Sequence, residues 1–356
     1  MLSADQFGDL NTPVIVIDEA VALANIRALQ DYCNAAGLGL RPHIKTHKMV
    51  AFARAQMDAG AIGINCQKIG EAEVMADGGL DDILITFNIL GAEKLERLRR
   101  LAGRVARLSV TADSAVTVAG LSAAFADAEH PLDVLVECDT GAGRCGVQTP
   151  QAAFELAEII ASSPGLHFGG LMTYPAVGGA GDAARFMTEA VGKLVAAGRE
   201  CPVVSTGGSP DMASAARLGI FTEYRAGTYV YNDRSLVERG ACGWPNCALG
   251  VLATVVSTPA PGRAVIDAGS KSLTSDLLGL EGFGYVAGST DTAIISLSEE
   301  HGVLHYGPAD TYRIGQRILV IPNHVCVVSN LFDEAWLMKI NGDLVRVAVD
   351  ARGTVS

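Results

Sequence analysis

Eight short apolar runs recur between residues 37 and 233, and most are followed by an Ala-rich segment with helical periodicity. The runs are residues 40–45, 63–67, 83–87, 107–112, 133–139, 168–174, 203–207 and 223–230, and the helical segments include 70–78, 92–102, 150–162 and 182–198. Strands that alternate with helices lie parallel in one sheet, and eight is the number that closes a barrel. The sequence therefore predicts an α/β fold with a (β/α)8 barrel of the TIM type. An open, doubly wound sheet is the alternative.

The chain after Cys247 has a different pattern. Runs rich in β-branched residues are separated by Gly, Pro and Asp, with little helical periodicity; they are residues 249–257, 263–268, 292–297, 317–321, 325–329 and 344–349. This pattern predicts a mostly antiparallel β domain. We place the barrel at residues 19–240 and the β domain at residues 241–356, joined by an N-terminal strand at residues 12–18.

Charge and hydropathy limit the classes of function. The net charge of -12 argues against nucleic-acid binding, which needs a basic face, and against adhesion to an anionic membrane. No apolar run approaches the ~18–20 residues of a spanning helix, and the first residues lack the features of a secretory signal. We expect a cytoplasmic protein that binds a small molecule and neither nucleic acid nor membrane.

The first run ends in the string RPHIKTHK at residues 41–48. Alternation along a strand would place His43, Lys45 and His47 on one face. A buried ammonium is costly unless it loses its proton or finds partners, and a neutral amine is what attacks a carbonyl. We therefore predict Lys45 as an amine nucleophile with His43 beside it, and Lys48 as part of a basic patch on an exposed loop. A place in such an exposed basic patch is also the alternative interpretation of Lys45.

Two glycine-containing segments belong to the seventh and eighth runs. They contain Thr206, Gly207 and Gly208, and Gly227, Thr228 and Tyr229. Glycine lets backbone N–H groups approach an anion closely, and the loops after strands seven and eight of a barrel commonly bind phosphate. The following Ser209-Pro210 step looks like a helix start, whose dipole favours anions. The segments predict a phosphate site, with ordinary turn glycines as the alternative.

The fifth and sixth runs lead to two further candidates. Arg144 follows the fifth run and is suited to a carboxylate or a ring nitrogen, with an ion pair to Asp139 as the alternative. Tyr174 ends the sixth run and is able to stack on a flat ligand. An amine, phosphate loops and an arginine on one rim suggest pyridoxal phosphate, which acts as an electron sink for a carbanion.

His324 and Cys326 stand apart in the predicted β domain. They are two residues apart, which would place both on one face of a strand. Imidazole and thiolate form a partial ligand set for zinc, and two protein ligands leave positions open for substrate. A buried cysteine beside a histidine is the alternative.

These motifs resemble the D-threonine aldolase and D-serine dehydratase family of fold-type III, alanine-racemase-like pyridoxal-phosphate enzymes. The resemblance covers residues 12–337 and is carried by Thr12-Pro13, the string at 41–48, and residues 141–146, 228–233 and 322–326. It implies a barrel with a β domain, a homodimer, and a site near the dimer interface.

The resemblance also implies residue roles. Lys45 would bind the cofactor as an imine, Arg144 would lie near the pyridine nitrogen, Tyr174 would line the pocket, and Gly207, Gly208, Gly227 and Thr228 would hold the phosphate. His324 and Cys326 would bind a divalent metal, zinc before manganese or magnesium.

The family implies two reactions on D-3-hydroxy amino acids, with the metal as a Lewis acid on the β-hydroxyl. Loss of water gives a keto acid and ammonia, whereas cleavage of the Cα–Cβ bond gives glycine and an aldehyde. Aldolase-like members carry His-x-Asp at the metal, and His324-Val325-Cys326 resembles the dehydratases instead. We expect a dehydratase of D-serine or D-threo-3-hydroxyaspartate; an aldolase, an amino-acid racemase and a non-catalytic pyridoxal-phosphate-binding protein are alternatives.

Overall fold

The computed structural model describes residues 2–8, 10–209 and 212–356, and the chain divides into two compact units. The barrel unit comprises Ala28–Lys45, Val50–Gly227 and Thr354–Ser356, and the β unit comprises Met1–Arg27, Thr46–Met49 and Thr228–Gly353. The domain boundary at residues 240 and 241 stays a prediction of the sequence.

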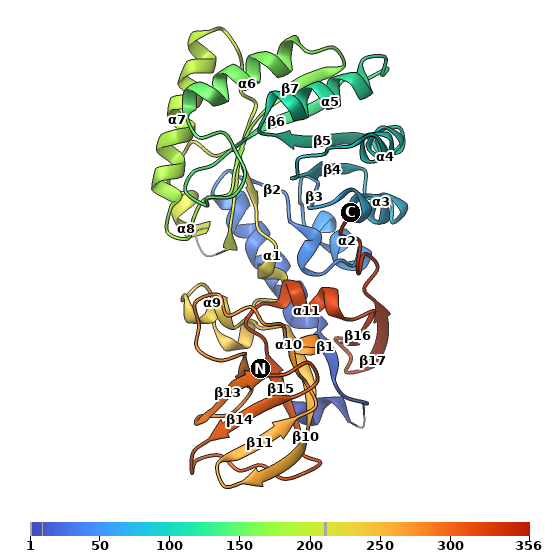
Figure 1. The fold of residues 1–356 in the computed structure, drawn as a ribbon, viewed down its shortest axis with the longest axis vertical. Coiled ribbons are helices and arrows are strands. Elements are labelled where there is room, and N and C mark those ends of the chain that lie inside the picture. The colour runs from blue at the N-terminus through green and yellow to red at the C-terminus, as the bar shows by residue number, and fades with distance from the viewer. Residues whose placement is uncertain (1, 9, 210–211) are drawn as a thin grey trace. The chain divides into compact units, whose positions relative to one another are not determined.

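The barrel unit is built on eight parallel strands (Figure 1). Their bounds are β2 Gly39–Leu40, β3 Ile64–Cys66, β4 Asp82–Ile85, β5 Arg107–Ala112, β6 Leu132–Cys138, β7 Leu166–Thr173, β8 Val203–Gly207 and β9 Glu223–Arg225. Their order is β2-β9-β8-β7-β6-β5-β4-β3, and a parallel bridge between His43 and Asn65 joins the two ends. Each strand from β3 to β9 lies beside the next one in the chain, unlike a doubly wound sheet, whose order reverses. The predicted barrel is confirmed.

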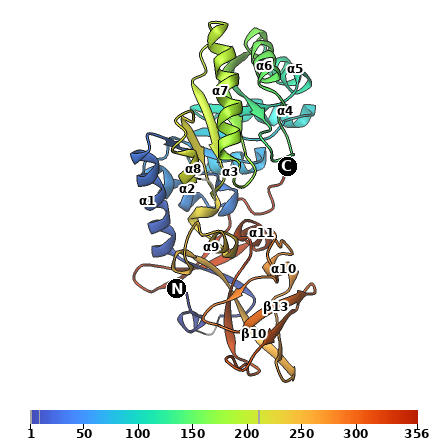
Figure 2. The same ribbon diagram turned by 90° about the vertical axis from the view of Figure 1, so that its left-hand side faces the viewer.

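Helices follow the strands of the barrel unit. They are α2 Val50–Asp58, α3 Ile69–Asp77, α4 Ala92–Ala102, α5 Ala115–Phe125, α6 Pro150–Ser162, α7 Ala180–Ala196 and α8 Met212–Ala215. Figures 1 and 2 show α4 to α7 on the outside of the sheet. Ser114 and Thr149 cap α5 and α6 by accepting backbone N–H bonds, as N-cap residues do. The helix start predicted at Ser209 includes Pro210 and Asp211, which lie outside the described residues.

The β unit contains a nine-stranded sheet. The strands are β1 Val14–Asp18, β10 Leu249–Ala260, β11 Arg263–Ile266, β12 Tyr285–Val286, β13 Thr292–Leu297, β14 Gly302–Tyr306, β15 Arg317–Ile321, β16 Glu334–Met338 and β17 Leu344–Ala348. Among these described strands, every pairing is antiparallel except that of β1 with β16. The predicted, mostly antiparallel sheet is therefore confirmed.

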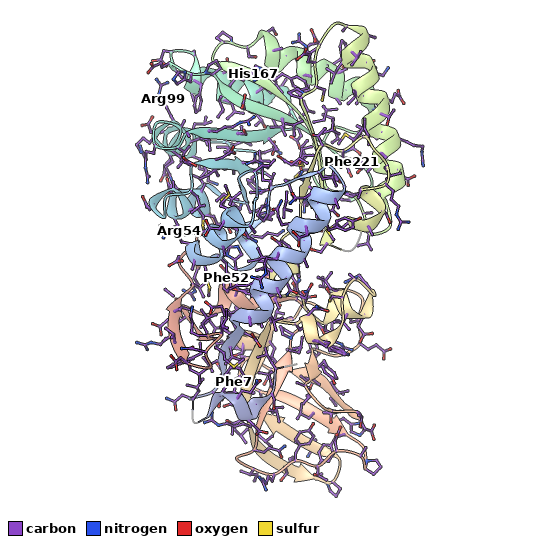
Figure 3. The ribbon with its side chains drawn as sticks, turned by 180° about the vertical axis from the view of Figure 1, so that it is seen from behind. Phe7, Phe52, Arg54, Arg99, His167 and Phe221 are labelled. Carbon is purple, nitrogen blue, oxygen red and sulfur yellow. The ribbon has the colours of Figure 1, made fainter. Side chains whose placement is uncertain are left out.

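Strand β1 forms the middle of this sheet. Val16 lies opposite Gly250 of β10 on one side and opposite Trp336 of β16 on the other. Val16 also packs in a buried apolar cluster with Phe7, which Figure 3 labels, and with Leu2, Cys247, Leu252, Leu319 and Ile321. Helix α1 (Glu19–Ala35) follows β1 directly.

Three predicted strand segments are wrong. Residues 41–45 do not continue β2, because Ile44–Thr46 form the 3-10 helix η2; residues 226–230 leave β9 and form η4 at Thr228–Val230. Residues 325–329 belong to the helix α11 (Val325–Leu331) and not to a strand. A short apolar run fits a strand or a buried helix equally well by periodicity, so contacts distant in sequence decide its conformation.

No helix in the described part of the chain is both long and apolar enough to cross a membrane.

Candidate active site

Lys45 lines a cavity of about 370 Å³ in the barrel unit. The other lining residues are Gln67, Thr86, Phe87, Asn88, Glu137, Arg144 and Cys145. They come from the carboxyl ends of strands or the segments that follow, which is where barrels hold their working residues. The structure therefore brings Lys45 and Arg144 together. Gln67 had no assigned role and Glu137 was missed, although both follow the strand-end rule that identified Lys45.

Hydrogen bonds fix the ring of His43 beside the backbone of Lys45. Gln67 donates through Nε2 to the carbonyl of Thr86 at 2.8 Å, so its Oε1, 3.1 Å from His43 Nε2, is an acceptor. His43 Nδ1 accepts the N–H of Lys45 at 3.4 Å. These bonds assign a proton to Nε2.

The predicted shared strand face of His43, Lys45 and His47 is wrong, because η2 replaces the strand. The predicted exposure of Lys48 is also wrong. Lys48 is buried, with a φ of 56°, and its amine donates to the carbonyl of Ala351 at 3.3 Å.

Arg144 and Tyr174 lie in contact. The guanidinium carbon of Arg144 is 5.1 Å from the centroid of the Tyr174 ring, a cation–π distance. Among the described residues, no ion pair joins Arg144 to Asp139. Asp139 instead accepts the backbone N–H groups of Gly141 and Gly143. Burial opposes ionisation of Asp139, but these bonds hold the pKa of its carboxyl below the ordinary range.

The glycines predicted to bind phosphate lie at neighbouring strand ends. Gly207 is opposite Arg225 in the β8–β9 ladder. Arg225 is followed two residues later by Gly227. A Cβ on Gly207 would lie 2.5 Å from the carbonyl oxygen of Arg225, and Gly208 has a φ of 108°, so both positions favour glycine. A Cβ on Gly208 would lie 3.9 Å from the Tyr174 ring, which places this loop beside Tyr174. Thr206 is buried in β8.

Charged residues fill part of the barrel interior. Arg225 is buried and donates to the hydroxyl of Ser205 and to the carbonyl of Thr173. Glu223 accepts from Ser205 and from Arg41 Nε, the latter at 2.8 Å. Burial lowers the pKa of Arg225 to about 10, against the opposing effect of Glu223. The spacing of Glu223 and Arg225 on one face of β9 was the available sequence signal.

His324 and Cys326 form one cluster in the β unit. His324 is the N-cap residue of α11, and Cys326 lies in its first turn. His324 Nδ1 is 3.1 Å from Asp233 Oδ2. Burial opposes protonation of His324, but the charges of Cys326 and Asp233 raise the pKa of His324 to about 10.

Two threonine hydroxyls complete this cluster. Cys326 Sγ is 3.1 Å from Thr46 Oγ1 and 3.7 Å from Thr228 Oγ1. The Thr228 side chain, predicted to bind phosphate, therefore contacts the cysteine; Tyr229 is buried on η4.

The donor set of this cluster fits a divalent metal. With Nδ1 directed at Asp233, Nε2 is the nitrogen of His324 that would bind a metal, the usual arrangement of a ligating histidine. A thiolate and an imidazole together suit zinc. The described residues contain no group of three or more His, Cys, Asp or Glu side chains arranged around one point. Two protein ligands would leave the other positions to water or substrate.

Comparison with known proteins matches both parts of the chain. The family described as alanine racemase, N-terminal domain matches residues 17–235, and a putative serine dehydratase domain matches residues 248–338. A D-threonine aldolase of Arthrobacter sp is 36% identical, covering 92% of this chain and 89% of that protein. The D-threo-3-hydroxyaspartate dehydratase of Delftia sp. strain HT23 is 31% identical, covering 94% and 96%.

Solved structures agree with these matches. The D-threonine aldolase of Filomicrobium marinum superposes with a TM-score of 0.91 at 31% identity, covering 98% of each chain. Two structures of a D-threo-3-hydroxyaspartate dehydratase superpose with TM-scores of 0.88 and 0.86. The first carries alanine in place of a histidine. The second carries alanine in place of a cysteine two residues further on and is in a metal-free form. The chain thus belongs to the alanine-racemase-like family of pyridoxal-phosphate lyases that includes D-threonine aldolase and D-serine dehydratase.

Proposed function

We propose that this protein is a pyridoxal-phosphate- and zinc-dependent dehydratase of D-3-hydroxy amino acids, with D-serine or D-threo-3-hydroxyaspartate as substrate. The observation that carries the proposal is the cluster formed by the His324 imidazole and the Cys326 sulfur. The dehydratase relatives with a substituted histidine and a substituted cysteine at the same spacing support it. A soft thiolate favours zinc over manganese or magnesium.

The barrel unit fits the cofactor. Lys45 Nζ would hold its aldehyde carbon, and the backbone around Thr206, Gly207, Gly208 and Gly227 would hold its phosphate. Thr228 and Tyr229, which follow in the chain and belong to the β unit, stay phosphate ligands predicted from the sequence. His43, Arg144 and Tyr174 would contact the ring. When bound, pyridoxal phosphate supplies an electron sink for the bonds at the substrate α-carbon.

The residues of the chain would divide the remaining work. Lys45 Nζ, as an amine on the cavity wall, would take the proton from the α-carbon. Gln67 accepts from His43 Nε2 and holds the imidazole in place. A divalent ion on His324 Nε2 and Cys326 Sγ would supply Lewis acidity to a hydroxyl group.

Retro-aldol cleavage is the second candidate function. The observation that favours it is the 36% identity to the Arthrobacter D-threonine aldolase over 92% of this chain. The two reactions use the same cofactor and differ in the bond broken: the bond from Cβ to oxygen in dehydration, and the Cα–Cβ bond in aldol cleavage. The homodimer and the cytoplasmic location stay predictions of the sequence.

Product analysis tests the proposal. Purified protein supplied with pyridoxal phosphate and zinc is given D-serine, D-threonine or D-3-hydroxyaspartate, with the L-enantiomers as controls. A dehydratase converts D-serine to pyruvate and ammonia, whereas an aldolase releases glycine and acetaldehyde from D-threonine. Glycine and aldehyde without keto acid would replace the first proposal by the second. No turnover of any D-substrate would reject both.

A further inference from the structure

Asp233 is a fully buried carboxylate beside His324. Its Oδ1 accepts the hydroxyl of Ser235 at 2.7 Å and the N–H of Leu236 at 3.1 Å, which makes it the N-cap of α9 (Arg234–Glu238). Its Oδ2 accepts His324 Nδ1 at 3.1 Å and the N–H of Val325 at 3.2 Å. With donors on both oxygens, the carboxylate has one orientation.

The backbone holds the same two segments together. The N–H of Arg234 donates to the carbonyl of Pro322 at 3.1 Å, and that of Ser235 donates to the carbonyl of Asn323 at 3.3 Å. In the bonds to Asp233 Oδ2 the donors lie on the other segment, at His324 and Val325. The distance from Asp233 to His324 is therefore set by main chain and side chain together.

Oδ2 acts on both members of the proposed metal pair. A carboxylate oxygen can only accept, so Nδ1 of His324 carries a proton. Nε2 is therefore the nitrogen that would bind a cation, in place of its own proton. The same oxygen accepts the N–H of Val325, which is the first residue of α11. The N-cap residue of α11, His324, makes no side-chain cap bond, so Asp233 accepts an N–H at the start of this helix instead. Cys326 lies in that first turn, so its position depends on the same atom.

We propose that Asp233 is the positioning residue of the metal centre, fixing the ring of His324 and the turn that carries Cys326 through Oδ2. The inference rests on the proposed metal-dependent function. In this role Asp233 contacts neither metal nor substrate. The competing explanation is that Asp233 serves only as the N-cap of α9.

Three substitutions separate these roles. Asp233→Ser keeps a good N-cap for α9 but is too short to reach His324. Asp233→Asn keeps the shape, but its amide cannot accept on both sides. Ser235→Ala, the matched control, removes one donor from Oδ1 and leaves both bonds of Oδ2.

Metal affinity is the measurement. The full-length, cofactor-loaded protein is stripped with a chelator, and its zinc dissociation constant is measured by competition with a chromophoric chelator. We expect Asp233→Ser and Asp233→Asn to weaken zinc binding by about 10–100-fold, the usual effect of losing such a partner, and Ser235→Ala to leave it unchanged. The thiolate-to-metal absorbance of the cobalt-substituted protein should fall in the same two variants, a change that loss of a helix cap alone does not produce.

The outcomes are distinguishable. Zinc binding of Asp233→Ser equal to that of the unsubstituted protein, with binding lost in His324→Ala, would overturn the role of Asp233 and leave the metal site standing. Equal binding by the unsubstituted protein and His324→Ala would overturn the metal site of the proposed function, and the role of Asp233 with it. If Asp233→Asn does not fold, the zinc affinity of Asp233→Ser decides the test, and thermal unfolding checks that this variant is folded.

Discussion

Thr46 Oγ1 lies 3.1 Å from Cys326 Sγ, and Thr46 is the residue that follows Lys45 in the chain. Its side chain has no exposed surface, so water does not compete for the hydroxyl. An O–H group that donates to an ionised acceptor makes a stronger bond than one that donates to a neutral acceptor. Thr46 is therefore suited to stabilise Cys326 as a thiolate.

Thr46→Val keeps the shape of the side chain and removes this donor. We expect zinc affinity to fall at least about tenfold, because a hydrogen bond to a charged group contributes about 1.5–3 kcal/mol. Thr46→Ser retains the hydroxyl and serves as the control. Zinc titration of the three proteins checks the prediction, and identical dissociation constants for the Val and Ser variants would contradict it.

The two lysines of the RPHIKTHK string should respond differently to substitution. Lys45→Ala should abolish the visible absorbance of bound cofactor, because the amine that holds it is gone. Lys48→Met should keep that absorbance and lower the free energy of unfolding by about 1–3 kcal/mol, because the buried carbonyl of Ala351 loses a donor. Borohydride reduction and mass spectrometry should locate the cofactor on Lys45. Cofactor attached to Lys48 would reverse the assignment.

Stability should depend on pH through Glu137. Burial raises the pKa of this carboxyl above its ordinary value of 4.5, although Arg144 and Arg225 act against the shift. The folded state therefore holds the proton more tightly than the unfolded state, so the contribution is complete below pH 4.5 and is lost as the pH rises through the folded pKa.

Glu137→Gln removes this titration. Urea unfolding between about pH 4 and pH 8 should show the wild type losing stability relative to the variant as the pH rises. Parallel curves for the two proteins would show that Glu137 ionises as readily in the folded chain as in the unfolded chain.

The barrel could be predicted because its signal is local. Each of the eight apolar runs overlaps a strand, since short β-rich runs between helical segments leave few other arrangements. The rule that strand ends carry the chemistry then identified Lys45 and Arg144, which line one cavity.

The conformation of the chemical segments could not be predicted in this way. The N–H of His43 still donates to the carbonyl of Ala226, in line with the β2–β9 ladder, but the next residues turn into η2 at Ile44–Thr46. Residues 325–331 form a helix whose first N–H donates to Asp233. The partner of Lys48 is 303 residues away in the sequence. Such bonds depend on the assembled fold, and no pattern within a short window contains them.

The place of β1 in its sheet has a consequence for synthesis of the protein. The apolar strand Val14–Asp18 pairs with β10 and β16, which begin at residues 249 and 334. At about 5–20 residues per second, a ribosome needs roughly tens of seconds to make those partners. Throughout that interval the segment is an unpaired β edge of the nascent chain, the kind of surface that chaperones shield.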